Sequence, residues 1–266
     1  MDFETLIVKA EGSLGRLILN RPGRLNALGA TIMRELIQAA EWFDRQSEVR
    51  VVIVSGEGRA FSAGADLKDP PTAGASHQSG ASWVERREAG QLGLRMADAI
   101  EGMRAVTIAQ VQGYAVGGGV VLMAACDLRV AAEDAVFSIP EIELGIPLAW
   151  GGIPRLVREI GPAMTKELVM TCRRFSPAEA KSLGFVNRVV PAAQLAQAAE
   201  ALAREVYEKP SVPVVLTKEH VNAVTRTMGA GQTAFADGDV LLANLSEPES
   251  REAGIKYRQK TIERER

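Results

Sequence analysis

The sequence predicts an α/β fold with parallel strands, followed by a region made only of helices. Short aliphatic or β-branched runs alternate with helical patterns through about residue 190, and the chain beyond is rich in Ala, Glu, Lys and Arg. Strands separated by helices pair in parallel, because each crossover helix returns the chain to the same edge of the sheet. A chain of 266 residues is long enough for one large core or two small ones.

Each expected element has its own pattern. The strands are short runs dominated by Val, Ile, Leu and Ala, at residues 16–19, 51–54, 106–109, 128–131 and 185–190. Helical patterns lie at residues 27–43, 93–103, 119–126 and 162–172. Residues 192–207, 212–226 and 248–266 are interpreted as helices because they are rich in Ala, Glu, Lys and Arg, with no clear strand between them. We therefore assign residues 1–195 to an α/β core and residues 196–266 to a helical C-terminal region.

Charge and hydropathy exclude two classes of partner. The chain carries 31 Lys and Arg residues against 33 Asp and Glu, a net charge of -2, which gives no broad cationic field for a nucleic acid. The N-terminal residues Asp2 and Glu4 are acidic where a secretory signal needs cations, and no apolar run approaches ~18 residues. We expect a cytoplasmic protein that binds neither nucleic acid nor membrane.

The two cysteines and one irregular segment carry further expectations. Cys126 and Cys172 lie in apolar stretches without CxxC spacing, so we expect buried packing residues rather than a disulfide framework or a metal site. Residues 69–82 lack periodicity and are full of turn formers. A segment of this kind is either a functional loop, such as a lid, or a tolerated surface insertion.

Two glycine-rich segments, residues 59–68 and 112–127, combine a strand end, small residues and a helix start. Small side chains leave backbone N–H groups accessible, and the first amides of a helix have no partner within it. Two such turns that face one another could hold a single oxygen atom from both sides. The sequence thus predicts an anion or carbonyl site at these turns.

Familiar motifs for other chemistries do not fit these segments. From Gly117 and Gly119, the third glycine of a dinucleotide fingerprint would fall at Leu122, and no phosphate loop of the GxxxxGK[ST] type occurs. Ser62 lacks the first glycine of a GxSxG elbow. The two histidines, His77 and His220, are interpreted as a loop and a helix-surface residue, which leaves a serine hydrolase without a base.

Taken in order, several motifs resemble the enoyl-CoA hydratase/isomerase (crotonase) family. They are Asn-Arg-Pro-Gly-Arg-Leu-Asn-Ala-Leu at 20–28, Ala-Phe-Ser-Ala-Gly-Ala-Asp-Leu-Lys at 60–68, Gly-Tyr-Ala-Val-Gly-Gly-Gly at 113–119, Cys-Asp at 126–127, Pro-Glu-Ile-Glu-Leu-Gly at 140–145 and Gly-Gly-Ile-Pro-Arg-Leu at 151–156. The resemblance spans nearly the whole chain. It implies a crotonase-like spiral of ββα units and a C-terminal helical region that forms homotrimers, commonly paired into hexamers.

The resemblance also implies a substrate and an oxyanion hole. The substrate is an acyl-CoA thioester, and no cofactor or metal is expected beyond the coenzyme A of the substrate itself. Two backbone amides, mapped onto Ala65 and Gly118, would hold the thioester oxygen. Removal of a proton next to a thioester places negative charge on that oxygen, and fixed amide dipoles stabilise the charge more than they stabilise the ground state.

One catalytic acid of the family is missing. Hydratases of the family place one glutamate on the helix after the glycine run and another in the Pro-Glu-x-x-x-Gly segment. The second corresponds to Glu141, whereas the first is replaced by Val121. Hydration needs a base for water and an acid for carbon, whereas one carboxylate suffices to move a double bond. Δ3,Δ2-enoyl-CoA isomerases of the family resemble this chain in both positions.

Neighbouring residues refine the expected subtype. Glu143 is close to Glu141 in sequence, and we expect it to face solvent. Dienoyl-CoA isomerases of the family carry an extra acid where this chain has Ala149. Trp150, beside it, either narrows the acyl pocket or packs in the core, and we place it with Val121 in the substrate pocket.

Coenzyme A would be bound by a small set of residues that the resemblance implies. They come from the segment near residue 24, the turn at 63–68 and the last helix: Arg24, Ala63, Asp66, Leu67, Lys68, Tyr257 and Lys260. Asp66 also fits a structural or helix-capping role. The last helix also fits a solvated, charge-alternating end.

Three functions remain open on the sequence alone. The first is an isomerase with Glu141 as proton shuttle. The second is an enoyl-CoA hydratase that works with one glutamate, and the third is a non-catalytic acyl-CoA-binding protein.

Overall fold

A six-stranded sheet forms the centre of the protein, which a computed structural model describes for residues 2–70, 80–227 and 236–265. Its strands lie in the order β1-β2-β3-β4-β6-β8, with bounds Leu6–Glu11, Leu14–Leu19, Val51–Gly56, Val106–Val111, Leu128–Ala132 and Arg188–Val190. β1 and β2 form an antiparallel hairpin, and every later pair is parallel. The predicted parallel α/β layout is confirmed.

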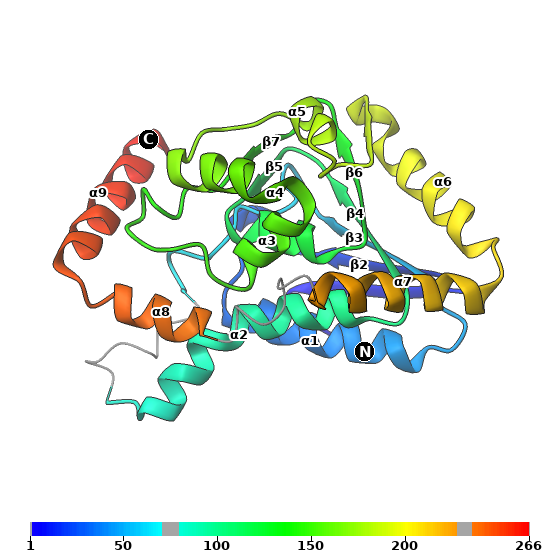
Figure 1. Cartoon of the computed structure of the whole chain (residues 1–266), viewed down its shortest axis with the longest axis horizontal. Helices are drawn as coiled ribbons and strands as arrows, with labels where there is room; N and C mark the ends of the chain where they lie inside the picture. The colour runs from blue at the N-terminus through cyan, green and yellow to red at the C-terminus, as the bar shows by residue number, and fades with distance from the viewer. Residues whose placement is uncertain (1, 71–79, 228–235, 266) are drawn as a thin grey trace.

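Helices cover both faces of this sheet (Figure 1). They are α1 Ala30–Arg45, α2 Trp83–Gly102, α3 Gly118–Ala125, α4 Gly152–Thr171, α5 Pro177–Ser182, α6 Leu195–Tyr207, α7 Ser211–Thr225, α8 Asp237–Asn244 and α9 Pro248–Glu265, with short 3₁₀ turns at Pro22–Arg24 and Ala192–Gln194. Val52 and Val54 of β3 face the core under α1, α2 and α3, whereas Val51 and Ile53 face α6. A strand buried on both faces explains the unbroken Val-Val-Ile-Val run.

A second, two-stranded sheet lies beside the first and belongs to the site. β5 (Tyr114–Val116) pairs in parallel with β7 (Val136–Ser138), with Ala115 opposite Phe137. Both strands are too short and too mixed in composition to show a strand pattern. The hairpin strand β1 and the helices α5 and α8 are likewise additions to the elements expected from sequence.

Two helices extend beyond their expected bounds for local reasons. α2 begins ten residues earlier than expected, because the Ser82 hydroxyl accepts the Glu85 amide while the Glu85 carboxylate accepts the Ser82 amide, which is a capping box. α4 combines two helical segments across Gly161, whose φ of 74° and ψ of 167° are not helical, and the sequence pattern had marked only the second segment.

The C-terminal region is helical throughout its described part, as expected (Figure 1). α6 packs on the sheet through Leu195, Ala199, Leu202 and Ala203. The boundary between the α/β core and the helical C-terminal region, drawn at residue 195, stays a prediction. α8 and α9 stand at the opposite end of the molecule from α6. Within the described residues, no helix is both long and apolar enough to span a bilayer.

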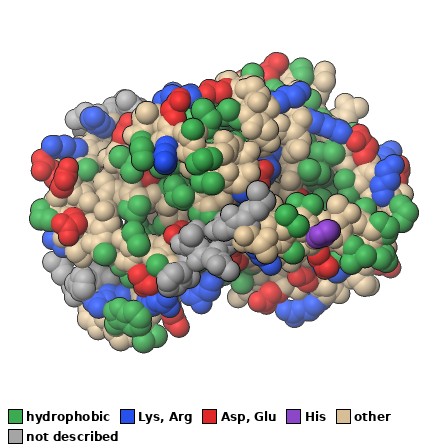
Figure 2. All heavy atoms as spheres, viewed as in Figure 1, with side chains coloured by type: hydrophobic (Ala, Val, Ile, Leu, Met, Phe, Trp, Pro, Cys, Tyr) green, Lys and Arg blue, Asp and Glu red, His purple; other side chains and the backbone are tan. Residues whose placement is uncertain are grey.

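Surface residues follow the expected distribution in part. Acidic and basic side chains alternate over the face in Figure 2, and His220 is exposed on α7, as predicted. Cys126 is buried, but Cys172, which follows the last turn of α4 in a left-handed conformation at φ 53°, is only partly buried. The expectation of a buried residue is therefore wrong for Cys172. His77 and most of the segment 69–82 lie outside the described residues.

A chain of largely buried ion pairs connects β6, α2 and α4. Arg129 of β6 bonds Glu159 at 2.6 Å, Arg158 bonds Glu159 at 2.9 Å, and Arg155 and Arg158 both bond Glu101 of α2. Burial alone would raise the pKa of Glu101, but the two guanidinium groups outweigh it and lower that pKa. The pairs therefore fix α2 against α4.

We predict that Glu101→Ala lowers the free energy of unfolding by about 1–3 kcal/mol, because it removes the carboxylate shared by two largely buried guanidinium groups, which then retain Asp98 and Glu159 as partners. Urea unfolding at pH 7 measures the change. Glu252→Ala, which breaks the exposed pair with Lys256 on α9, is the control and should change stability by less than about 0.5 kcal/mol. Equal effects of the two variants would contradict the structural role of Glu101.

Candidate active site

Two backbone turns meet at the edge of the sheet where β3 and β4 end. The Ser62 amide donates to the Tyr114 carbonyl and the Val116 amide donates to the Ser62 carbonyl, each at 3.0 Å. A Cβ on Gly64, whose φ is +82°, would lie only 2.4 Å from the Val116 oxygen and 3.2 Å from the Gly118 nitrogen. Only glycine allows this approach, so the predicted juxtaposition of the two glycine-rich segments is present.

Each turn offers one free amide to the same cavity. Leu28 donates to the Gly64 carbonyl and accepts from the Asp66 amide, so the N–H of Ala65 between them faces away from Leu28. Gly118 is the first residue of α3, and its N–H has no partner within the helix. Among the described residues neither amide has an acceptor, and both residues line one cavity.

The cavity has a volume of about 440 Å³ and is largely apolar. Its walls come from the two turns, the segment after Glu141, α3, α8 and α9: Ala65, Leu67, Pro70, Gly118, Val121, Glu141, Leu144, Ile146, Pro147, Leu148, Ala149, Trp150, Leu241, Leu245, Ser250, Arg251, Gly254, Ile255 and Arg258. Val121, only 1% exposed, and Trp150 both belong to it. Glu141 is the one carboxylate among these described residues.

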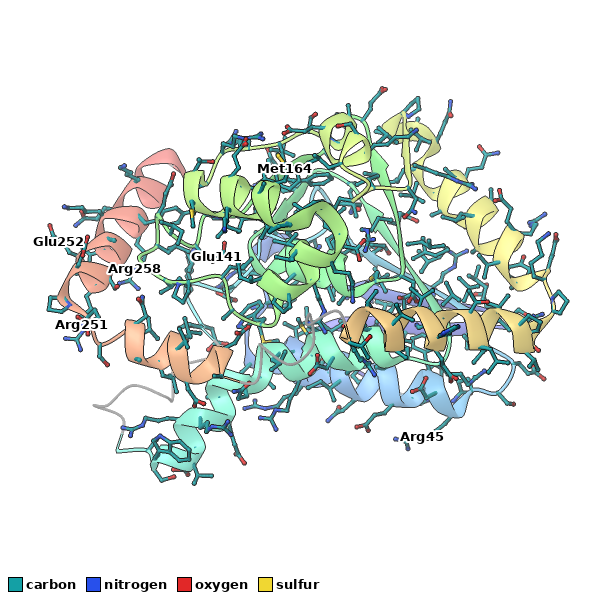
Figure 3. All side chains as sticks on the ribbon, viewed as in Figure 1. Arg45, Glu141, Met164, Arg251, Glu252 and Arg258 are labelled. Carbon is teal, nitrogen blue, oxygen red and sulfur yellow. The ribbon has the colours of Figure 1, made fainter. Side chains whose placement is uncertain are left out.

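Glu141 sits on a turn directly after β7, pressed against the start of α3. The Gly117 amide donates to the Ser138 carbonyl at 2.9 Å, and a Cβ on Gly117 would lie 2.3 Å from Glu141 Oε1. Glu141 is 9% exposed, and its Oε2 has no hydrogen-bond partner among the described residues. Burial raises the pKa of Glu141 from 4.5 to about 7. Figure 3 labels this side chain between the core and α9.

A second buried acid, Asp66, is surrounded by cations and amide donors rather than by apolar groups. It pairs with Arg21 at 3.0 Å and Arg24 at 2.5 Å, and accepts the amides of Lys68 and Asp69. Burial would raise the pKa of Asp66, but these hydrogen bonds lower it below its usual range. The carboxylate thus organises the turn that carries Ala65, which is the structural alternative considered for Asp66.

The predicted coenzyme A residues are only partly brought together. Leu67 lines the cavity, whereas the side chain of Lys68 is exposed at its edge. The Ala63 amide donates to the Leu25 carbonyl and is occupied within the protein. Arg24 remains 40% exposed although it pairs with Asp66.

The last helix lines the cavity with residues other than those expected to bind coenzyme A, whose role stays a prediction. Tyr257 and Lys260 do not line the cavity, whereas Arg251, Gly254, Ile255 and Arg258 do. Figure 3 labels Arg258 on the side of α9 toward Glu141 and Glu252 on the other side. The charges of this helix alternate around its axis, so sequence offers no signal for the inner face. Leu241 of α8 and Leu245 just after it also line the cavity, and no sequence pattern had marked them.

The remaining sequence candidates fall where expected. Glu143 is exposed, although it follows Glu141 by two residues. The Ser62 hydroxyl donates to the Asn26 carbonyl and accepts the Gly64 amide, so it holds the turn rather than facing the cavity.

Known proteins are similar to this chain in sequence and in fold. The family model for enoyl-CoA hydratase/isomerase matches residues 9–262. A probable enoyl-CoA hydratase of Rhizobium meliloti is 35% identical over 97% of this chain and all of its own. The short-chain-enoyl-CoA hydratase of Clostridium acetobutylicum is 34% identical, with 84% and 82% covered. A peroxisomal Delta(3,5)-Delta(2,4)-dienoyl-CoA isomerase of Arabidopsis thaliana is 38% identical, with 70% and 68% covered.

The structural comparison agrees. An enoyl-CoA hydratase/isomerase from Mycobacterium paratuberculosis superposes with a TM-score of 0.86 at 26% identity, covering 96% of this chain and 100% of the other. The fold is therefore the crotonase-like fold that the motifs predicted. The chain belongs to the enoyl-CoA hydratase/isomerase family and is an enzyme of that kind.

We predict that Glu141→Gln stabilises the protein above pH 7. The unfolded carboxyl titrates near 4.5 and the folded one near 7, so the folded state binds more protons in this window. Wild-type stability therefore falls as pH rises through the window, by roughly 3 kcal/mol, whereas the neutral amide does not titrate. Urea unfolding between pH 4.5 and 8 measures the difference. The exposed Glu143→Gln is the control, and parallel curves for wild type and Glu141→Gln would refute the raised pKa.

Proposed function

We propose that this enzyme binds an enoyl-CoA thioester and moves its double bond, with Glu141 as the only proton carrier. The observation that carries the proposal is that, in the part of the chain that the structure describes, Glu141 is the single carboxylate of a cavity that also holds the unpaired amides of Ala65 and Gly118. Val121 takes the position where a second acid would face the substrate.

The two amides suit the charge that develops in this reaction. Loss of the proton next to the thioester turns its carbonyl oxygen into an enolate oxygen, which extends into a dienolate when a double bond lies one carbon further on. Fixed N–H donors stabilise this charge more than the ground-state carbonyl, and one such donor is worth roughly 3–4 kcal/mol in comparable sites. Ala65 and Gly118 would each supply one donor.

Glu141 suits both halves of the proton transfer. A carboxylate with a pKa of about 7 takes a proton readily at neutral pH and returns it as readily. It would remove the proton from the carbon next to the thioester and return it two carbons away, so no water and no second acid take part. The apolar walls around Glu141 exclude competing water.

Hydration is the second candidate, because relatives from Rhizobium meliloti and Clostridium acetobutylicum bear hydratase names. Water addition needs one group to deprotonate water and one to protonate carbon. Glu141 alone would have to serve both in turn. This requirement is why we place isomerisation first.

The proposed coenzyme A position follows the turn at residues 63–68, where Leu67 lines the cavity and Lys68 is exposed for a phosphate. We further propose a homotrimer, or trimers paired into hexamers. Apolar side chains on α7 support it, because Val212, Leu216, Val221 and Val224 are exposed and no residue of this helix is buried.

We predict that the enzyme converts a 3-enoyl-CoA to the 2-enoyl isomer and that Glu141→Gln lowers kcat at least 10²-fold, because the proton carrier is lost. Product analysis by liquid chromatography measures the rate. The neighbouring Glu143→Gln should retain wild-type activity, since its side chain is exposed.

Rapid hydration of crotonyl-CoA that survives Glu141→Gln would overturn both the proposed reaction and the proposed role of Glu141 as its base. Tight acyl-CoA binding without turnover or α-proton exchange would indicate a non-catalytic binder.

We also predict that Val121→Glu raises the rate of crotonyl-CoA hydration relative to wild type, because it restores an acid on the cavity wall formed by α3. Val121→Gln is the control of similar size without an ionisable group, and it should not hydrate faster. Circular dichroism of both variants checks that a polar side chain at this buried position leaves the fold intact. A folded Val121→Glu variant with no gain over Val121→Gln would contradict the proposed position of the substrate.

A further inference from the structure

Trp150 is held between two helices, with a glycine facing each part of its indole ring. A Cβ on Gly93 of α2 would lie 2.3 Å from the Trp150 Cγ, and a Cβ on Gly118 of α3 would lie 2.0 Å from its Cζ3. Gly93 lies well inside α2, where glycine weakens a helix relative to alanine. The absence of a side chain at these two glycines therefore leaves the space that the indole ring occupies.

The backbone of Trp150 is itself unusual. Its φ is +60°, a left-handed conformation that a bulky residue rarely adopts. The next residue, Gly151, donates its amide to the Asp237 carboxylate of α8 at 2.8 Å, and the Trp150 carbonyl accepts Arg155 Nη1 at 3.4 Å. Such conformations persist where the surroundings impose them, and they are concentrated at functional sites.

The indole ring of Trp150 forms part of one wall of the cavity. Trp150 is 8% exposed and lines the cavity together with Val121 of α3 and Leu148. The ring packs against the backbones of Gly93 and Gly118, so it fills space between α2 and α3 that a smaller side chain would leave open. Leu241 of α8 and Leu245, which directly follows this helix, also line the cavity.

We propose that Trp150 determines substrate specificity by limiting the length of an apolar acyl chain. The inference rests on the proposed function, since it assumes that an acyl-CoA thioester has its carbonyl at Ala65 and Gly118. Because the indole lies against Gly118, it stands close to the reacting end of the acyl group. Short acyl groups end before the ring, and longer ones collide with it. In apolar pockets one methylene changes discrimination by roughly 10–200-fold.

The test compares acyl chains of four and ten carbons in wild type, Trp150→Ala and Trp150→Leu. We expect the ratio of kcat/KM for the ten-carbon 3-enoyl-CoA to that for the four-carbon one to rise at least tenfold in Trp150→Ala and less in Trp150→Leu. Trp83→Ala, which removes a tryptophan of α2 that is 62% exposed, should leave the ratio unchanged. If Trp150→Ala does not fold, Trp150→Leu decides the outcome.

A double variant separates a specificity role from a structural one. Gly93→Ala collides with the indole in wild type but has space in Trp150→Ala, where its methyl group refills part of the vacated volume. We expect the Gly93→Ala/Trp150→Ala variant to return the chain-length ratio toward the wild-type value. A mere loss of stability in Trp150→Ala would not be reversed in this way.

Binding distinguishes this inference from the proposed function. Calorimetry with butanoyl-CoA and decanoyl-CoA, which have no double bond to move, measures the same preference without turnover. Turnover and binding ratios that stay at the wild-type value in both Trp150 variants would overturn the role of Trp150, and a shift in Leu245→Ala alone would instead assign the chain to the α8 side. Failure of every variant and of wild type to bind any acyl-CoA would overturn the proposed function and this inference with it.

Discussion

The contact between two backbone turns is the constraint on which the site depends. β3 and β4 are parallel neighbours, so the segments that leave their C-terminal ends meet at one edge of the sheet. They meet so closely that a Cβ on Gly113 would lie 1.9 Å from the Arg59 carbonyl oxygen. β5 then pairs with β7, and β7 leads directly to Glu141. The backbone thus places both amides and the segment that carries Glu141, and the side chains of Ser62 and Asp66 hold the turn that contains Ala65.

The same backbone arrangement shifts the pKa values of two buried carboxyl groups in opposite directions. Asp66 is surrounded by arginines and amides that lower its pKa, whereas Glu141 has apolar neighbours that raise it. Both effects arise from position, since the two side chains carry the same chemical group. Pairing of Asp66 stabilises the turn. Burial of Glu141, whose Oε2 has no hydrogen-bond partner among the described residues, destabilises the folded protein at high pH, and the raised pKa suits the proton transfer that we propose for it.

Much of the fold was predictable, because strands buried on both faces are read directly from runs such as Val51 to Val54. That Ala65, Gly118 and Glu141 lie around one cavity was predictable from motifs, although no composition or periodicity would have placed Glu141 beside Gly117. Contacts between distant segments were not predictable. Trp150 meets Gly93 across 57 residues, and nothing in either local pattern points to the other.

The inner face of α9 was unpredictable for a different reason. Its charged residues are distributed around the helix, so Arg258 and Lys260 are equivalent in sequence until the helix is packed against Leu144 and Gly145. The start of α2, in contrast, carried a readable signal in Ser82 and Glu85 that the apolar pattern obscured.

The packing of the indole ring against Gly93 and Gly118 also restricts which substitutions this chain can accept and in which order. While Trp150 is present, alanine is excluded at Gly93 and at Gly118, so these three positions are not free to vary one by one. Loss of the tryptophan must come first, and a later alanine at Gly93 would then prevent its return. The order of substitutions is therefore fixed by the packing, and a lineage that opens this end of the cavity cannot easily close it again by the same route.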